Sequence, residues 1–183
     1  MARIPYVDPE TAAPAVREVF ALLPVRLNIF KLMAHAETCF RAWIRLGSQI
    51  LGKQKLSGKL RELAILRVAK LSGAVYEWVQ HVPIALRVGV SQAQVAALER
   101  GDATADCFEE SERLLLRFTD EVVRDVGASR ATHDALARHL SSQELVELVL
   151  AIGFYMTVAR LMQSFEIDLD PPQGERVLEA VSR

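Results

Sequence analysis

Residues 56–98 read LSGKLRELAILRVAKLSGAVYEWVQHVPIALRVGVSQAQVAAL, and this stretch decides the fold. Ser57 is a favourable N-cap and residues 59–71 contain no proline, so they are predicted to form a helix. Apolar residues recur on nearly every side of this helix, which is typical of a helix buried within the protein. Glu62 and Arg67 must then be partly buried as well, and buried charges need partners or a function.

A second helix is predicted over residues 74–88, after a break at Ser72-Gly73. Glu77 and His81 are four residues apart, so on a helix they share a face and can touch. A carboxylate beside an imidazole orients the ring and raises its basicity, which suits acid–base catalysis near neutral pH. The sequence therefore places a candidate site on this helix.

The rest of the chain shows helical patterns without period-two alternation, which predicts an all-α fold class. Asp8 followed by Pro9 predicts the start of a first helix that ends before Pro24. Ser141 and Glu144 form a capping box that opens a long helix to about residue 165. Other helices are expected at residues 36–51, 92–100, 109–126 and 129–139. We expect a single helical domain over residues 1–170, followed by a mobile or partner-bound C-terminal tail over residues 171–183.

The composition narrows the class of partner and the compartment. The 183 residues suffice for one core, and 22 Lys and Arg against 23 Asp and Glu give no basic face, so no nucleic-acid partner is expected. The longest apolar run, residues 148–159, is shorter than the about 20 residues of a membrane span, and the N-terminus lacks a signal-like segment. We expect a cytoplasmic protein with no membrane partner, in which Cys39 and Cys107 are free thiols.

The pattern of Glu62 followed by Gly73-Ala74-Val75-Tyr76-Glu77-Trp78-Val79-Gln80-His81 resembles the carboxymuconolactone decarboxylase and alkylhydroperoxidase D-like superfamily. The resemblance implies an all-α helical bundle that forms a homo-oligomer, with a trimer or hexamer favoured. It also implies that the Cys-x-x-Cys of the peroxidase branch corresponds here to Ala74 and Glu77. Because both thiols are absent, the resemblance points to the decarboxylase-type branch.

The resemblance and the spacing together suggest His81, Glu77 and Glu62 as catalytic residues and Tyr76, Trp78 and Arg67 as substrate-binding residues. His81, held by Glu77, would move a proton on a small, cyclic carboxylate or lactone. Glu62 would hold the other nitrogen of His81 or act as a second acid–base group. No metal and no cofactor is expected.

Simpler interpretations remain open for several of these residues. Glu62 could form a buried ion pair with Arg67 or Arg61, Tyr76 could pack without touching substrate, and Trp78 could belong to the core or an interface. The whole chain could be a non-catalytic ligand-binding or assembly protein on the same scaffold. A thiol peroxidase is not expected, because neither cysteine has a second cysteine or a histidine nearby in the sequence.

Overall fold

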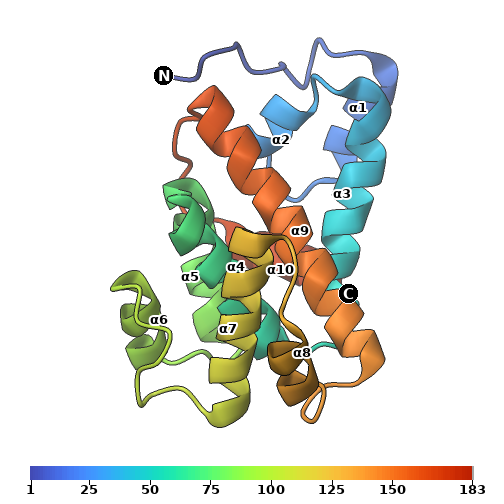
Figure 1. Cartoon of the computed structure of the whole chain (residues 1–183). Coiled ribbons are helices and arrows are strands. Elements are labelled where there is room, and N and C mark those ends of the chain that lie inside the picture. The colour runs from blue at the N-terminus through green and yellow to red at the C-terminus, as the bar shows by residue number, and fades with distance from the viewer. Residues whose placement is uncertain (183) are drawn as a thin grey trace.

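The computed structural model describes residues 1–182 and contains ten α-helices and no strand in this part of the chain (Figure 1). The all-α fold class is therefore confirmed. The helices are α1 (Pro14–Leu22), α2 (Asn28–Met33), α3 (Glu37–Gly52), α4 (Gly58–Ser72), α5 (Val75–Arg87), α6 (Gln92–Glu99), α7 (Glu110–Asp125), α8 (Arg130–Leu136), α9 (Ser142–Phe165) and α10 (Gly174–Ser182).

Helix α4 is the centre of the core, as its apolar pattern predicted. Every residue from Arg61 to Ala69 is buried, and the helix packs against α5, α7 and α9. The Ser57 side chain caps its first turn by accepting a hydrogen bond from the Leu60 amide at 3.3 Å. Gly73 ends the helix with φ of 62°, a left-handed conformation that favours glycine, and the chain turns there into α5.

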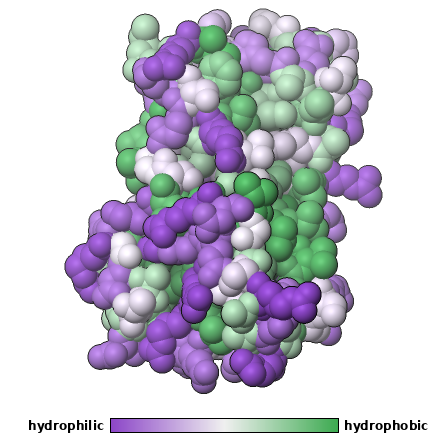
Figure 2. All heavy atoms as spheres, viewed as in Figure 1, coloured by the Kyte–Doolittle hydropathy of each residue, from purple (hydrophilic) through white to green (hydrophobic). Residues whose placement is uncertain are grey.

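Helix α9 is the second long element of the core and runs diagonally across the molecule in front of α4 (Figure 1). The predicted capping box is present, because Ser141 and Glu144 satisfy each other's backbone amides. By length and composition α9 could cross a membrane, but a core helix passes the same test. Its outer face exposes Val146, Val149 and Leu150, and apolar side chains gather on this side of the molecule (Figure 2).

The first helix begins later than the sequence predicted. The Asp8 carboxylate accepts a hydrogen bond from the Glu10 amide at 3.0 Å and so caps only a turn. The backbone of Ala13 is extended, with ψ of 146°, and α1 then starts at Pro14. Pro14, rather than Pro9, therefore occupies the first helical position.

The C-terminal segment also differs from the mobile or partner-bound tail that we expected. Residues 174–182 form α10, which packs against α3 and α5; residue 183 lies outside the described part. Two glycines allow this close approach. A Cβ at Gly174 would lie 2.2 Å from the carbonyl oxygen of Gln80, and one at Gly52 would lie 2.3 Å from that of Val181. The sequence gives no sign of these long-range contacts.

Candidate functional site

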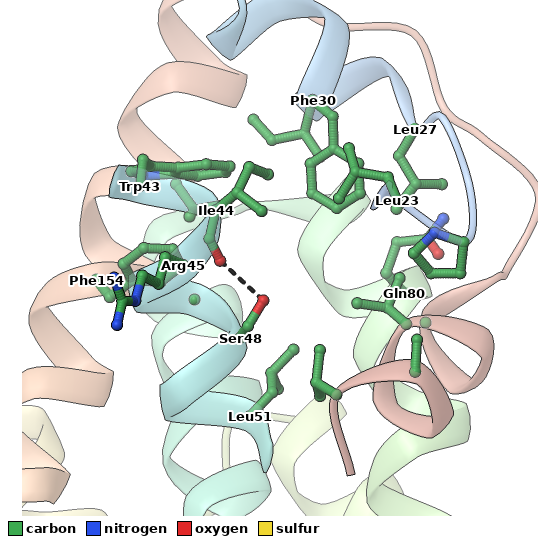
Figure 3. A pocket seen from close by; sticks show the side chains of 18 of the residues that line it. Leu23, Leu27, Phe30, Trp43, Ile44, Arg45, Ser48, Leu51, Gln80 and Phe154 are labelled. Atoms are coloured by element: carbon green, nitrogen blue, oxygen red, sulfur yellow. Dashed lines mark hydrogen bonds between the residues drawn. The ribbon is translucent and has the colours of Figure 1, made fainter. Parts of the chain in front are cut away.

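The helices enclose a cavity of about 600 Å³, lined by residues of α1, α2, α3, α5, α9 and α10. Its walls are mainly aliphatic and aromatic. Leu23, Leu27, Phe30, Ile44 and Leu51 surround the opening in Figure 3, with Gln80 on the side opposite Arg45. A cavity of this volume is in the range that holds small organic ligands.

Helix α5 brings Glu77 and His81 to the cavity. Their spacing of four residues places both on one face of the helix, and both line the cavity. Only 1% of Glu77 and 7% of His81 is exposed. The sequence analysis placed these two residues on a common face, and the structure agrees.

Of the two carboxylates expected to contact His81, Glu62 from α4 forms the hydrogen bond and Glu77 does not. The Nδ1 atom of His81 lies 2.7 Å from Oε2 of Glu62. Arg61 donates a hydrogen bond from Nε to the other carboxylate oxygen of Glu62, at 3.1 Å. Since a carboxylate accepts hydrogen bonds, Nδ1 carries the proton in a neutral ring and Nε2 keeps its lone pair. The arrangement can therefore supply a base in the wall of the cavity.

The Glu77 carboxyl differs from that of Glu62 in having no hydrogen-bond partner among the described residues. Both of its carboxyl oxygens are buried and unpaired among the described residues. Burial raises the pKa of Glu77 well above its ordinary value, and the negative charge of Glu62 raises it further. A raised pKa favours the protonated, neutral form of Glu77, and this form can donate a proton.

Tyr155 on α9 completes the buried polar wall of the cavity. Its ring meets the imidazole of His81 edge to face, with centroids 4.7 Å apart and planes at 85°. Burial and then the negative charge of Glu62 raise the pKa of Tyr155, so its hydroxyl stays protonated. From the sequence, Tyr155 is a possible anchor for a substrate carboxylate, but a structural role is favoured, so it is not among the predicted site residues. The available signal was a tyrosine in the most apolar run of the chain, where a hydroxyl needs a reason to be buried.

Tyr76 lines the cavity as predicted, but its hydroxyl is engaged elsewhere. It donates a hydrogen bond to the Asp170 carboxylate. One turn later, Gln80 donates to the carbonyl oxygens of Asp170 and Pro171 and accepts from the Gln173 amide at 2.8 Å. Tyr76 and Gln80 thus fasten the segment that leads into α10, while Glu77 and His81 face the cavity.

The structure does not bring Arg67 and Trp78 to the site. Arg67 donates two hydrogen bonds to the Asp120 carboxylate, at 2.5 and 2.7 Å, and one to the Gly101 carbonyl oxygen at 3.0 Å. It therefore ties α4 to α7, and Asp120, rather than Glu62, is its ion-pair partner. Trp78 is partly buried, packs against the core and does not line the cavity. Neither residue contacts the space in which a substrate would bind.

Within residues 1–182, no group of three or more His, Cys, Asp and Glu side chains is arranged to hold a metal ion. Cys39 and Cys107 are exposed free thiols and do not line the cavity. Thiol chemistry at this site would need a cysteine in the cavity wall. By the resemblance described above, Ala74 and Glu77 occupy the two cysteine positions of the peroxidase branch.

A model of the carboxymuconolactone decarboxylase family matches residues 37–121, which include Glu62, Glu77 and His81. Solved structures with alkylhydroperoxidase D-like folds align with the chain as well. Residues 37–121 are thus similar to the carboxymuconolactone decarboxylase family, and the whole chain shares its fold with the alkylhydroperoxidase D-like structures. The comparison with curated proteins gives no match.

Three solved structures are similar to this chain in fold. The alkylhydroperoxidase D core of an uncharacterised peroxidase-related protein from Ralstonia eutropha aligns with a TM-score of 0.78 and 19% identity, over 98% of this chain and 96% of that chain. The putative antioxidant defence protein ATU0492 from Agrobacterium tumefaciens aligns with a TM-score of 0.68 and 24% identity, over 75% of this chain and 94% of that chain. The debrominase Bmp8 aligns at 0.72 and 20%, over 92% of each chain. At these identities the likeness shows the fold alone.

Proposed function

We propose that this protein is an acid–base enzyme of the carboxymuconolactone decarboxylase type. In this proposal His81 moves a proton at a carbon next to a carbonyl group, on a cyclic carboxylate or lactone. The single observation that carries the proposal is the hydrogen bond between Glu62 and His81, a residue that lines a mainly apolar cavity. A carboxylate that holds one ring nitrogen leaves the other as an oriented base.

The proposed step follows from the charges around the site. His81 Nε2 takes a proton from the carbon, and the electron pair of the broken C–H bond moves toward the carbonyl oxygen. The neutral carboxyl of Glu77 gives its proton to that oxygen, which forms an enol. In an isomerisation, the imidazolium returns the proton to a different carbon of the enol, and the enol O–H proton goes back to Glu77. In a decarboxylation, the bond from carbon to the carboxylate breaks instead of a C–H bond, CO₂ leaves, the electron pair forms the enol, and a proton is then added to that carbon. Glu62, balanced by Arg61, stabilises the imidazolium that forms.

Hydrogen–deuterium exchange tests the proposal without knowledge of the natural substrate. Benzylacetone, an uncharged ketone with hydrogens on both carbons next to the carbonyl, is incubated with the protein in D₂O, and its proton NMR signals are followed. The proposal predicts exchange faster than in buffer, and a return to the buffer rate with His81→Ala. Equal rates for the wild type and His81→Ala would remove the basis of the proposal.

A non-catalytic binding protein is the second candidate, and one observation favours it. The carboxyl oxygens of Glu77 are buried in the cavity wall, so Glu77 must move slightly before it reaches a substrate. On this alternative benzylacetone binds, but its hydrogens exchange no faster than in buffer. A thiol peroxidase is disfavoured by the position of both exposed cysteines outside the cavity lining.

We also propose that the protein is a cytoplasmic homo-oligomer with no nucleic-acid or membrane partner. The support for self-association is the exposed apolar face of α9, in a chain of which 51% of the residues are hydrophobic. A trimer or hexamer remains the prediction from the superfamily. The near-neutral charge of −1 argues against a nucleic-acid partner.

A further inference from the structure

The charged and uncharged parts of the cavity wall are separated. Three cationic residues line the cavity among the described residues: Arg41, Arg45 and Lys53, all exposed and all on or directly after α3. We call them the cationic rim. The buried polar wall consists of Glu77, His81 and Tyr155, and it contains no cation of its own. The two buried arginines of α4, Arg61 and Arg67, do not line the cavity.

Both of these buried arginines are already paired. Arg61 is held by Glu62, and Arg67 is held by Asp120. An anionic group at the buried wall would therefore lose its hydration without finding an arginine or lysine to pair with, and it would lie near the negative charge of Glu62. Burial of an unpaired charge is strongly unfavourable. The buried wall thus favours an uncharged group next to His81.

The cationic rim offers little compensation. Arg41 is paired with Glu18 at 2.7 Å, and Arg45 lies across the cavity from Gln80 (Figure 3). Arg45 and Lys53 are exposed, and an ion pair between exposed groups contributes only about 0–1 kcal/mol. A carboxylate at the rim would therefore add little to the affinity.

The volume and the apolar wall set the size and character of the occupant. Trp43 and Phe154 stack with ring centroids 5.2 Å apart, and Phe30 meets Trp43 edge to face. On the other side, Val177 and Val181 of α10 close the cavity. A small polar acid would leave most of the about 600 Å³ unfilled and would forgo dispersion contacts with these walls.

We infer that the cavity takes an uncharged carbonyl compound, a lactone or ketone with an extended apolar body, whose carbonyl group lies at Glu77, His81 and Tyr155. The inference rests on the proposed function for the position of the reacting group. It narrows that function, because an uncharged substrate has no carboxylate to lose. Of the two reactions proposed for this site, decarboxylation is then excluded and isomerisation by proton transfer remains.

A matched pair of probes tests the charge preference. Benzylacetone and hydrocinnamate share the same phenylethyl body and differ in the replacement of a methyl group by an anionic oxygen. Dissociation constants are measured by calorimetry at pH 8 with the wild type and with His81→Ala. We expect benzylacetone to bind both proteins, and hydrocinnamate to bind at least about tenfold more weakly, because its charge must be desolvated. Equal or tighter binding of hydrocinnamate, or no binding of benzylacetone, overturns the inference.

Three single variants and one double variant show where the probes bind. Val177→Trp fills the cavity from α10, and Ala180→Trp does so from an exposed position that tolerates substitution; both should abolish benzylacetone binding. Arg176→Trp, next to Val177 but outside the lining, should leave it unchanged. If both cavity-filling variants keep full affinity, the probe binds elsewhere and the inference fails. If Arg45→Ala with Lys53→Ala removes tight hydrocinnamate binding, the rim is an anion site, which also contradicts the inference.

The outcomes separate this inference from the proposed function. Binding is read in His81→Ala, which has no base, so it does not depend on proton transfer. Selective binding of benzylacetone without exchange of its hydrogens would support the ligand class and contradict the enzyme. Exchange together with a preference for hydrocinnamate would support the enzyme and contradict the ligand class.

Discussion

The Nδ1 atom of His81 on α5 lies 2.7 Å from Oε2 of Glu62 on α4. Helix α4 is held by core contacts on all sides, so it fixes Glu62, and Glu62 in turn fixes the ring of His81. The rings of His81 and Tyr155 pack edge to face at a centroid distance of 4.7 Å. A side chain held at one nitrogen and packed against an aromatic ring has little freedom to turn, which is what an oriented base requires.

Replacing Glu62 by Gln is expected to lower the rate of deuterium exchange into benzylacetone by about a hundredfold or more. Glutamine keeps the shape of the side chain but removes the negative charge that stabilises the imidazolium. It also allows the ring to adopt the other tautomer. The rate is measured by NMR, with circular dichroism to show that the variant is folded.

Glu99→Gln provides the matched control, because Glu99 is an exposed residue of α6 and does not line the cavity. The Glu99→Gln variant should catalyse deuterium exchange into benzylacetone at the wild-type rate. An equal loss in both variants would assign the effect of Glu62→Gln to a general change in charge.

The buried carboxyl of Glu77 predicts a pH dependence of stability. Below its ordinary pKa of 4.5 the group is protonated in both the folded and the unfolded chain. As the pH rises, the unfolded chain releases this proton while the folded protein keeps it, because burial raises the folded pKa. The contribution of Glu77 to the free energy of unfolding therefore falls with rising pH, until the folded pKa is passed.

Glu77→Gln removes this ionisation, so its stability relative to the wild type should increase between pH 5 and pH 8. Urea unfolding at both pH values measures the difference, with Glu99→Gln as the control that should show no such change. A stability difference that stays the same at the two pH values would mean that Glu77 ionises normally in the folded protein.

The docking of α10 depends on close backbone contacts. A Cβ at Gly174 would lie 2.2 Å from the Gln80 carbonyl oxygen, so Gly174→Ala must displace α10. We expect amide hydrogens of residues 174–182 to exchange about tenfold faster or more, at a cost of about 1–3 kcal/mol in docking. Mass-spectrometric hydrogen exchange resolves this segment from the rest of the chain.

Gly153 in α9 is the contrasting position, since a Cβ there meets nothing within 4 Å. Gly153→Ala should stabilise the protein by about 0.5–1 kcal/mol through helix propensity and leave the exchange of α10 unchanged. Unchanged exchange of residues 174–182 in Gly174→Ala would show that α10 is not held by this contact.

Self-association is expected to involve the apolar residues of α9 that the single chain leaves exposed, including Leu150, which is 49% exposed. Leu150→Glu should lower the molar mass measured by light scattering during gel filtration, because a buried charge destabilises an apolar interface. Glu110→Gln, at an exposed position at the start of α7, should keep the wild-type mass. A wild-type mass equal to that of one chain would contradict the homo-oligomer.

The parts of the fold that could be predicted are those set by local chemistry. Ser57, Gly73 and the pair Ser141 and Glu144 act through neighbours within one helical turn or so, and the structure confirms each of them. The first helix was predicted too early, because Asp8 and Pro9 fit a helix start and a capped turn equally well.

The partner choices of the charged residues could not be predicted in this way. His81 shares a face with Glu77, but its hydrogen bond goes to a residue 19 positions away, and Arg67 pairs with Asp120, 53 positions away. Such pairs depend on how helices pack, which the spacing within one helix does not encode. The sequence placed Glu77 and His81 on one face of α5 and named Glu62 as a possible second partner of His81. The Glu62 contact is present, but the expected hydrogen bond between Glu77 and His81 is not.

The most direct test of the central claim is the tautomer of His81, read by nitrogen-15 NMR of the imidazole at a pH where the ring is neutral. The account predicts that Nδ1 carries the proton, that Nε2 is unprotonated, and that Glu62→Gln disturbs this state while Glu77→Gln does not. A ring protonated at Nε2, or one that is indifferent to Glu62→Gln, would contradict an oriented base in the cavity and with it the proposed proton transfer.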